Sequence, residues 1–412
     1  MNNSSIKLSK LFLILLFCLT YLTAQDMKKV SETDSEEIPQ KISVNSGKTI
    51  VLMELYSNKP VVEVKINGKG PFKFFLDTGA GGTVLNQDLA NELKLPMKGT
   101  RKIGDPTDPQ GITANRNFVE TLEVGGATFS NFIAVSWDNS ILYKEGAPRG
   151  VLGMPLFTKL LLTVDYPNKK VIIAKGSLPK ANGEDVIDYQ ITEAGLFGVP
   201  LKIGMLDTIA TLDTGAPSGL SFPSSYVDKL SLEGKPVEVG RGRTVAGEAI
   251  IYGAKLRETV KLGQYNFDNP AITFFSRLTH LNIGYRILNQ FAITVDQQNR
   301  RLKFEKASLT GNNSGQTNSN QIPNDKGKFN EYAGRYGERR LTVENGGLYL
   351  QRISGPRGEG PKIKLSEVSK DAFALPETNE IRVKFVRNQN HEISEIQILT
   401  PSGDWETSKK EN

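Results

Sequence analysis

The sequence predicts an all-β protein in which two homologous lobes are followed by a small β-domain. Three observations predict this architecture. The 412 residues include 39 Gly and 20 Pro, and short runs rich in Val, Ile, Thr and Phe lie between turn residues. A long segment recurs within the chain. After a polar linker, a last stretch alternates apolar and polar residues at the period of a strand.

The composition argues against several functions. The net charge is +6, but the basic residues are scattered and form no stripe that could follow phosphates, so no nucleic acid partner is expected. The single cysteine, Cys18, and the two histidines, His280 and His391, are too few for a structural zinc site, a disulfide framework or a His-based triad. No metal and no cofactor are therefore expected.

The N-terminus has the pattern of an export signal. Lys7 and Lys10 precede an apolar run over residues 11–22, which ends in small residues before Gln25. We expect residues 1–24 to be a signal peptide cleaved after Ala24, so that the mature protein is periplasmic, on the cell surface or secreted. Lipidation at Cys18 is the alternative, which bulky Phe17 disfavours. The apolar run is too short for a stable membrane span.

Composition also divides the rest of the chain. Residues 25–44 are polar and of mixed charge, as in a flexible tether or a pro-segment. An N-terminal lobe is expected over 45–182 and a C-terminal lobe over 183–309. Residues 310–328, rich in Asn, Ser and Gly, form a linker. Residues 329–412 show short alternating strands and tight turns, which predict a small antiparallel β-domain.

The two lobes follow from an internal repeat. PVVEVKINGKGPFKFFLDTGAGGTVL, starting at Pro60, recurs as GVPLKIGMLDTIATLDTGAPSGLSF, starting at Gly198, and two later pairs of segments match in the same order. Each copy indicates short antiparallel strands joined by hairpins. One short helix per copy is expected, over residues 86–95 and 224–232.

Both copies carry Asp-Thr-Gly-Ala directly after an apolar strand. Asp77 and Asp213 begin these tetrapeptides and lie at equivalent points of the repeat. A single copy is typical of an ordinary turn. Two copies in register are not expected by chance, so they indicate a paired site. The residues that would support the two carboxylates are Thr78, Gly79, Ala80, Thr214, Gly215 and Ala216.

Two carboxylates that face each other across a pseudo-twofold axis cannot ionise independently, so they share one proton. The ionised member can take a proton from a water as it attacks a carbonyl, and the protonated member can donate to the developing oxyanion. Glycine after each threonine allows a close approach of the backbone. Each threonine hydroxyl can hydrogen-bond to the opposite loop, whereas Ala80 and Ala216 add no donor.

Residues 45–306 resemble a single-chain, two-lobed aspartic protease, and LDTGAGGTVL is similar to the active-site loop of retropepsins. The resemblance implies barrel-like lobes related by a pseudo-twofold axis, with Asp77 and Asp213 as the catalytic pair. It also implies an interlocking loop beneath each catalytic turn, made of two apolar residues and a glycine. Asn282 departs from that pattern, which weakens the expected packing in the second lobe. The matching residues are Val151, Leu152, Gly153, Ile283 and Gly284.

The same resemblance implies flap hairpins, for which residues 104–111 and 240–247 are the candidates. Pepsin-like proteases carry Ser or Thr after Asp-Thr-Gly, and that hydroxyl helps the pair to hold a negative charge. Because Ala80 and Ala216 lack it, the sequence predicts a less acid-shifted pair that works at mildly acidic to neutral pH.

The sequence thus favours an exported aspartic endopeptidase acting on peptide or protein substrates, with both halves in one chain, so that a monomer suffices. A catalytically silent, protease-like module that binds peptides or serves as a scaffold is the alternative. A hydrolase of non-peptide substrates is a third hypothesis. For the C-terminal domain, a spacer role is favoured over substrate, cell-wall or partner binding.

Overall fold

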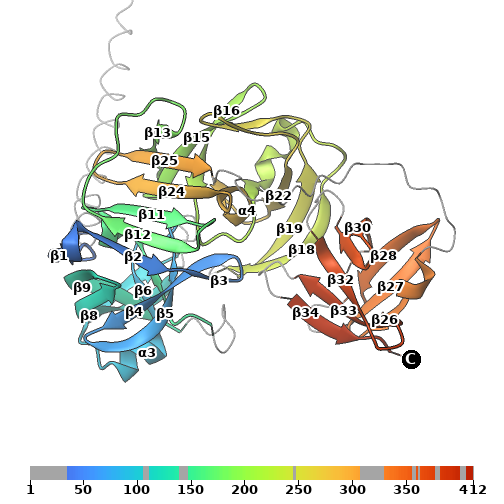
Figure 1. Cartoon of the computed structure of the whole chain (residues 1–412), viewed down its shortest axis with the longest axis horizontal. Coiled ribbons are helices and arrows are strands. Elements are labelled where there is room, and N and C mark those ends of the chain that lie inside the picture. Colours follow the sequence, from blue (N-terminus) through green and yellow to red (C-terminus); the bar gives the residue numbers. More distant parts are fainter. Residues whose placement is uncertain are drawn as a thin grey trace, which may run out of the picture.

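A computed structural model describes residues 35–104, 111–138, 147–244, 247–306, 329–354, 359–360, 362–375, 381–399 and 405–411 (Figure 1). Strands dominate these residues, which confirms the all-β prediction. Among them, no helix combines the length and apolar character that crossing a membrane would need. The expected signal peptide at 1–24 and linker at 310–328 lie outside the described residues.

The first large sheet has nine strands from the N-terminal part of the chain. Its order is β1-β9-β6-β10-β5-β4-β8-β7, β3 pairs with β4, and an additional β8–β9 pairing closes the sheet on itself as a barrel. The strands are β1 (Lys41–Val44), β3 (Glu54–Tyr56), β4 (Lys59–Ile66), β5 (Lys69–Leu76), β6 (Val84–Asn86), β7 (Met97–Ile103), β8 (Ile112–Val124), β9 (Ala127–Trp137) and β10 (Gly150–Leu152).

The second large sheet has ten strands in the order β18-β19-β22-β17-β23-β16-β15-β20-β21, with β14 paired to β15. The strands are β14 (Gln190–Ile191), β15 (Phe197–Ile203), β16 (Leu206–Leu212), β17 (Leu220–Pro223), β18 (Val237–Thr244), β19 (Gly247–Lys255), β20 (Val260–Leu262), β21 (Tyr265–Phe267), β22 (Ala271–Phe275) and β23 (Leu281–Ile283).

The two sheets repeat one pairing scheme. In the first, β5 runs parallel to β10, which is antiparallel to β6, which is parallel to β9. In the second, β16 runs parallel to β23, which is antiparallel to β17, which is parallel to β22. The internal repeat in the sequence therefore corresponds to a repeat in space. The expected helix over 86–95 is α3 (Gln87–Glu92), whereas residues 224–229 form a 3-10 helix (Ser224–Lys229).

A third, six-stranded sheet joins the two halves, with three strands from each. Its order is β13-β25-β24-β11-β12-β2, and every pairing is antiparallel. At its centre β11 pairs with β24, where the hydroxyls of Thr163 and Thr294 lie 2.8 Å apart. The strands are β2 (Lys48–Leu52), β11 (Leu161–Asp165), β12 (Lys170–Ala174), β13 (Val186–Asp188), β24 (Phe291–Asp296) and β25 (Arg301–Lys306).

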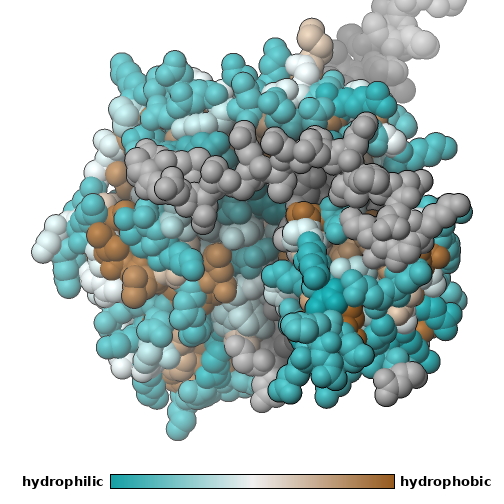
Figure 2. All heavy atoms as spheres, turned by 45° about the vertical axis from the view of Figure 1, so that its right-hand side comes forward, coloured by the Kyte–Doolittle hydropathy of each residue, from teal (hydrophilic) through white to brown (hydrophobic). Residues whose placement is uncertain are grey.

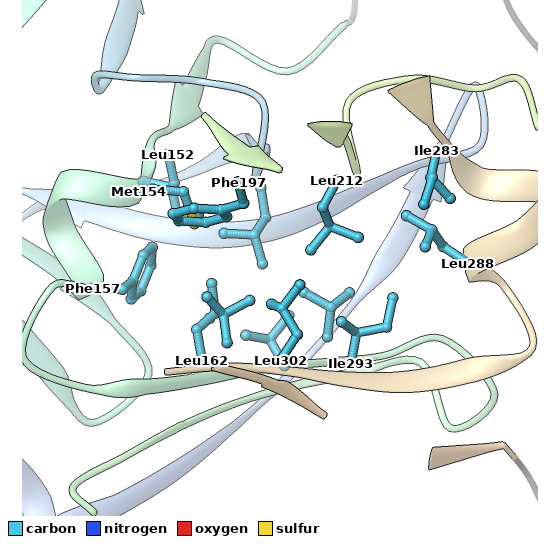
Figure 3. Close-up of a cluster of buried hydrophobic side chains, with 14 of the residues drawn as sticks. Leu152, Met154, Phe157, Leu162, Phe197, Leu212, Ile283, Leu288, Ile293 and Leu302 are labelled. Carbon is cyan, nitrogen blue, oxygen red and sulfur yellow. The ribbon is translucent and has the colours of Figure 1, made fainter. Parts of the chain in front are cut away.

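One hydrophobic core spans both halves. Leu162 and Ile293 project from the joining sheet toward Leu212 and Ile283 of the second sheet and Leu152 of the first (Figure 3). These side chains are fully buried or nearly so. Leu212 ends β16, from which the second Asp-Thr-Gly-Ala turn starts, and Leu152 and Ile283 end β10 and β23, which pair in parallel with β5 and β16. The core therefore holds the strands that lead into and support both turns.

The C-terminal residues form two further antiparallel sheets around a separate core that includes Tyr336 and Phe373 (Figure 1, orange and red). The first contains β26 (Gly334–Tyr336), β27 (Arg339–Glu344), β28 (Gly347–Arg352) and β29 (Ile363–Lys364). The second contains β30 (Ser366–Ser369), β31 (Ala372–Ala374), β32 (Ile381–Arg387), β33 (Ile393–Leu399) and β34 (Trp405–Lys409).

Part of the segment expected to be flexible is packed on the first sheet. Lys41–Val44 form β1 and pair with β9, and the backbone N–H of Ile133 donates to Glu36 at 2.7 Å. Glu37 is only 3% exposed and forms an ion pair with Arg101 of β7. The sequence analysis missed this packing because the segment has few apolar residues. The segment is held instead by the pairing of β1 with β9 and by the ion pair of the Glu37 carboxylate with Arg101.

Leu162→Ala should lower the free energy of unfolding by about 3 kcal/mol, because Leu162 is fully buried in the core that both halves share. Urea denaturation followed by fluorescence measures the change. Leu52→Ala, in the same sheet but at a side chain that is 84% exposed, is the matched control and should change stability by less than about 0.5 kcal/mol. Equal effects of the two substitutions would contradict a shared core.

Candidate active site

Asp77 and Asp213 come directly after β5 and β16, at equivalent points of the two sheets. The buried residues that precede them, Leu76 and Leu212, anchor each turn in the core. The structure brings the two carboxyl groups, 136 residues apart in sequence, within hydrogen-bonding contact of each other. The two predicted carboxylates therefore form one site at the junction of the halves.

Reciprocal hydrogen bonds of two buried threonines join the turns. Thr78 Oγ1 donates to the carbonyl of Leu212 at 2.7 Å and accepts from the backbone N–H of Thr214 at 3.0 Å. In the mirror arrangement, Thr214 Oγ1 donates to the carbonyl of Leu76 at 2.8 Å and accepts from the N–H of Thr78 at 3.0 Å. Each hydroxyl thus uses both its donor and an acceptor site across the junction, which fixes the spacing of the two turns.

The glycine after each threonine leaves room for the opposite carboxylate. A Cβ atom on Gly79 would lie 2.9 Å from Asp213 Oδ1, and one on Gly215 would collide with the carboxylate of Asp77. The N–H of Gly79 also donates to Asp77 Oδ1 at 2.7 Å. Any side chain at these two positions would therefore push the carboxyl groups apart.

The predicted interlocking residues lie beside the turns. The N–H of Asp77 donates to Leu152 at 3.2 Å, and that of Asp213 to Ile283 at 3.0 Å. Val151 pairs with Phe75 in the parallel β5–β10 ladder. The residue after each interlocking glycine bonds to the alanine of the Asp-Thr-Gly-Ala turn. The N–H of Met154 donates to the carbonyl of Ala80 at 3.1 Å, and that of Tyr285 to the carbonyl of Ala216 at 2.9 Å. Cβ atoms on Gly153 and Gly284 would collide with the backbone of the turn.

Asn282 has a role that the sequence analysis did not predict. Its Nδ2 donates to Asp213 Oδ2 at 2.9 Å. In the sequence it is only a polar residue where an apolar one is usual, and it was expected to weaken the packing of the second half. The informative signal was its place, two residues before Gly284 on a strand that runs parallel to the one that ends at Asp213.

Burial raises the pKa of both carboxyl groups. They are half-buried, with the protein removing most of the water around them. For Asp213 burial is the largest cause and the charge of Asp77 the next, and together they raise its pKa to about 8. For Asp77 the backbone N–H of Gly79 and the positive charge of Lys59 oppose the rise. At mildly acidic to neutral pH the pair therefore holds one proton.

The two flap candidates lie at β-hairpins. Residues 104–111 connect β7 to β8, and residues 240–247 fall within the β18–β19 hairpin. The connection over 105–110 lies outside the described residues, as does that over 245–246. The strands that flank each candidate pair with each other, and the flap assignment itself stays a prediction.

An apolar hollow that is open to solvent lies beside the second turn. It begins at Pro217, and its walls include Val239, Phe275 and, from the C-terminal domain, Leu375. Two arginines, Arg286 and Arg382, also line it. On the face seen in Figure 2, hydrophilic residues cover most of the surface, and hydrophobic ones form small groups.

Residues 62–156 match the model of a protein family described as aspartyl protease. This stretch is an aspartyl protease-like domain. It includes Asp77 and the interlocking residues of the first half, as well as β5 and β10 on which they lie. No curated protein matches the chain significantly.

Thr78→Val should lower the free energy of unfolding by about 2 kcal/mol, because the carbonyl of Leu212 and the N–H of Thr214 then lose their partner in a buried place. Thermal and chemical unfolding measure the loss. Thr78→Ser keeps the hydroxyl and should recover most of it. A loss of stability in Thr78→Ser with none in Thr78→Val would show instead that the threonine acts through its methyl group.

The free energy of unfolding should fall as the pH rises from about 4 to about 8. The pKa of Asp213 is about 8 in the folded state and 3.8 as the ordinary value, so between these limits only the folded chain holds the proton. The stabilisation is complete below the lower value and is lost as the pH passes the upper one, a change on the order of 5 kcal/mol. Asp213→Asn should flatten this dependence, as calorimetry at several pH values would show. Parallel curves for the two proteins would contradict the raised pKa.

Proposed function

We propose that the protein is an aspartic endopeptidase in which Asp77 and Asp213 activate a water against a peptide carbonyl. One observation carries the proposal. The two carboxyl groups stand at equivalent points of two similar sheets and face each other closely, and the reciprocal threonine bonds join their turns. The family match over residues 62–156 supports it from the first half. We further propose that the two halves are the two lobes of such a protease.

In the proposed reaction the ionised carboxylate takes a proton from the water, whose oxygen bonds to the carbonyl carbon. The protonated carboxyl donates its proton to the carbonyl oxygen, so a neutral tetrahedral diol forms. The C–N bond then breaks as the amine nitrogen receives a proton from a carboxyl, and the diol returns a proton as it becomes a carboxylic acid. The pair ends with the single proton it began with.

We propose that substrate binds extended between the halves, as an added strand. Main-chain hydrogen bonds would then supply affinity, and side-chain pockets would supply specificity. The hollow beside Pro217 is a candidate for such a pocket, since its walls are mainly apolar. Leu375 and Arg382 lie in the same lining, so the C-terminal domain is proposed to take part in substrate contact as well as in spacing.

The expected working range is mildly acidic to neutral, because Ala80 and Ala216 carry no hydroxyl that would favour the ionised pair. Export after cleavage near Ala24, and action as a monomer, complete the proposal. The second candidate function is a catalytically silent module that binds peptides in the same cleft.

Cleavage of a diverse peptide library by the mature protein across pH 3–8 tests the proposal. Asp77→Asn and Asp213→Asn should each abolish cleavage, at least 10³-fold. Asp207→Asn, on the same strand as Asp213 but exposed, is the matched control and should cleave as the wild type does. No cleavage at any pH, together with binding of peptides, would favour the silent module.

A further inference from the structure

The pair of carboxyl groups is not symmetric in its surroundings. In the second half, Asn282 lies opposite Thr211 in the parallel ladder of β16 and β23, and its amide donates to Asp213 Oδ2 at 2.9 Å. The equivalent position in the first half is Val151, opposite Phe75 in the ladder of β5 and β10. One carboxylate therefore has an amide donor where the other has an isopropyl group.

Packing alone does not explain why an asparagine stands at position 282. Asn282 Oδ1 is buried and has no hydrogen-bond partner among the described residues, and the same holds for Thr211 Oγ1 on the neighbouring strand. A buried carbonyl without a partner destabilises the fold. An apolar side chain would avoid this, as Val151 does in the first half. The compensating interaction of Asn282 is its hydrogen bond to Asp213.

A hydrogen bond from a neutral donor stabilises an ionised carboxylate more than a protonated one. Asn282 thus supplies to Asp213 the kind of donor that Ala216 lacks. This changes the picture drawn from the sequence, in which both alanines left the pair equally without one. At these two equivalent positions, the described residues include a side-chain donor for Asp213 but none for Asp77.

Few other groups can influence this charge. The partner turn contributes Asp77, and Tyr166 follows directly after β11. Tyr285 of α4 (Tyr285–Leu288) packs against Tyr166, and Lys59 of β4 lies near Asp77. Phenols and ammonium groups ordinarily ionise near pH 10. Within pH 3–8 the carboxyl pair is therefore the group whose titration the amide modulates.

We propose that Asn282 is a positioning residue that orients the Asp213 carboxyl group and lowers the pH at which Asp213, the member of the pair that keeps its proton longer, becomes ionised. The proposal deepens, and rests on, the proposed protease function. It makes the two halves unequal, with the second half carrying the donor. In the proposed reaction this sets the alkaline limit of activity, because the pair stops working once both carboxyl groups are ionised.

Asn282→Val tests this, since it gives the second half the residue that the first half has. The alkaline limb of the kcat/KM profile should move up by about 1 pH unit, while the rate at pH 5 changes much less. Val151→Asn adds a donor next to Asp77, so it should move the acid limb down and leave the alkaline limb in place. The double variant, with the two residues exchanged, should show both shifts. Asn282→Ser is polar but too short to reach Asp213, so it should behave like Asn282→Val.

An equal loss of rate at every pH, with the alkaline limb unmoved, would overturn the proposal, as would rescue by Asn282→Ser. A second readout does not depend on proteolysis. The pH at which stability is lost, followed by thermal unfolding, should move up in Asn282→Val and Asn282→Ser. If the wild type cleaves no peptide but this midpoint moves, the protease function fails and the role of Asn282 stands. If the protein cleaves but the midpoint stays in place, the role of Asn282 fails alone.

Discussion

The crossed hydrogen bonds of Thr78 and Thr214 are the constraint on which the site depends. A half-buried pair of carboxylates repels itself as soon as both ionise, so something other than the pair must hold it together. The hydroxyls do so without charge, and each satisfies backbone groups of the opposite half. Because they are buried, water does not compete for them. The glycines then let the carboxyl groups approach to hydrogen-bonding contact.

The six-stranded joining sheet and the shared core also keep the two halves aligned with each other. The side chains of Leu152, Leu212 and Ile283 project from the strand ends near the site into the core. There they pack with Leu162 and Ile293 of the joining sheet. A shift of one half against the other would therefore open cavities in the core as well as break hydrogen bonds above it. Packing and polar bonds restrain the same movement, so the geometry of the pair is doubly determined.

Much of the fold could be predicted from the sequence, because the repeat and the period-2 patterns are local features. Asp77, Thr78 and their counterparts stood out since their type and register recur. The pairing of β11 with β24 could not be predicted, because the sequence of neither strand indicates which other strand it pairs with. Asn282 was visible only as a departure, since its function depends on a contact across strands. Glu37 looked like part of a solvated segment until Arg101 was placed beside it.

The joining sheet also bears on how the chain reaches its native state. Thr163 and Thr294, paired at its centre, are 131 residues apart in sequence, and each half supplies three of its strands. Neither half can bury its share of the core while the other is absent. Contacts between such distant segments must wait for closure of a long loop, which makes folding slow relative to a chain with local pairings. Because the site is built from both halves, it forms only when the two halves come together, which is the last step of folding.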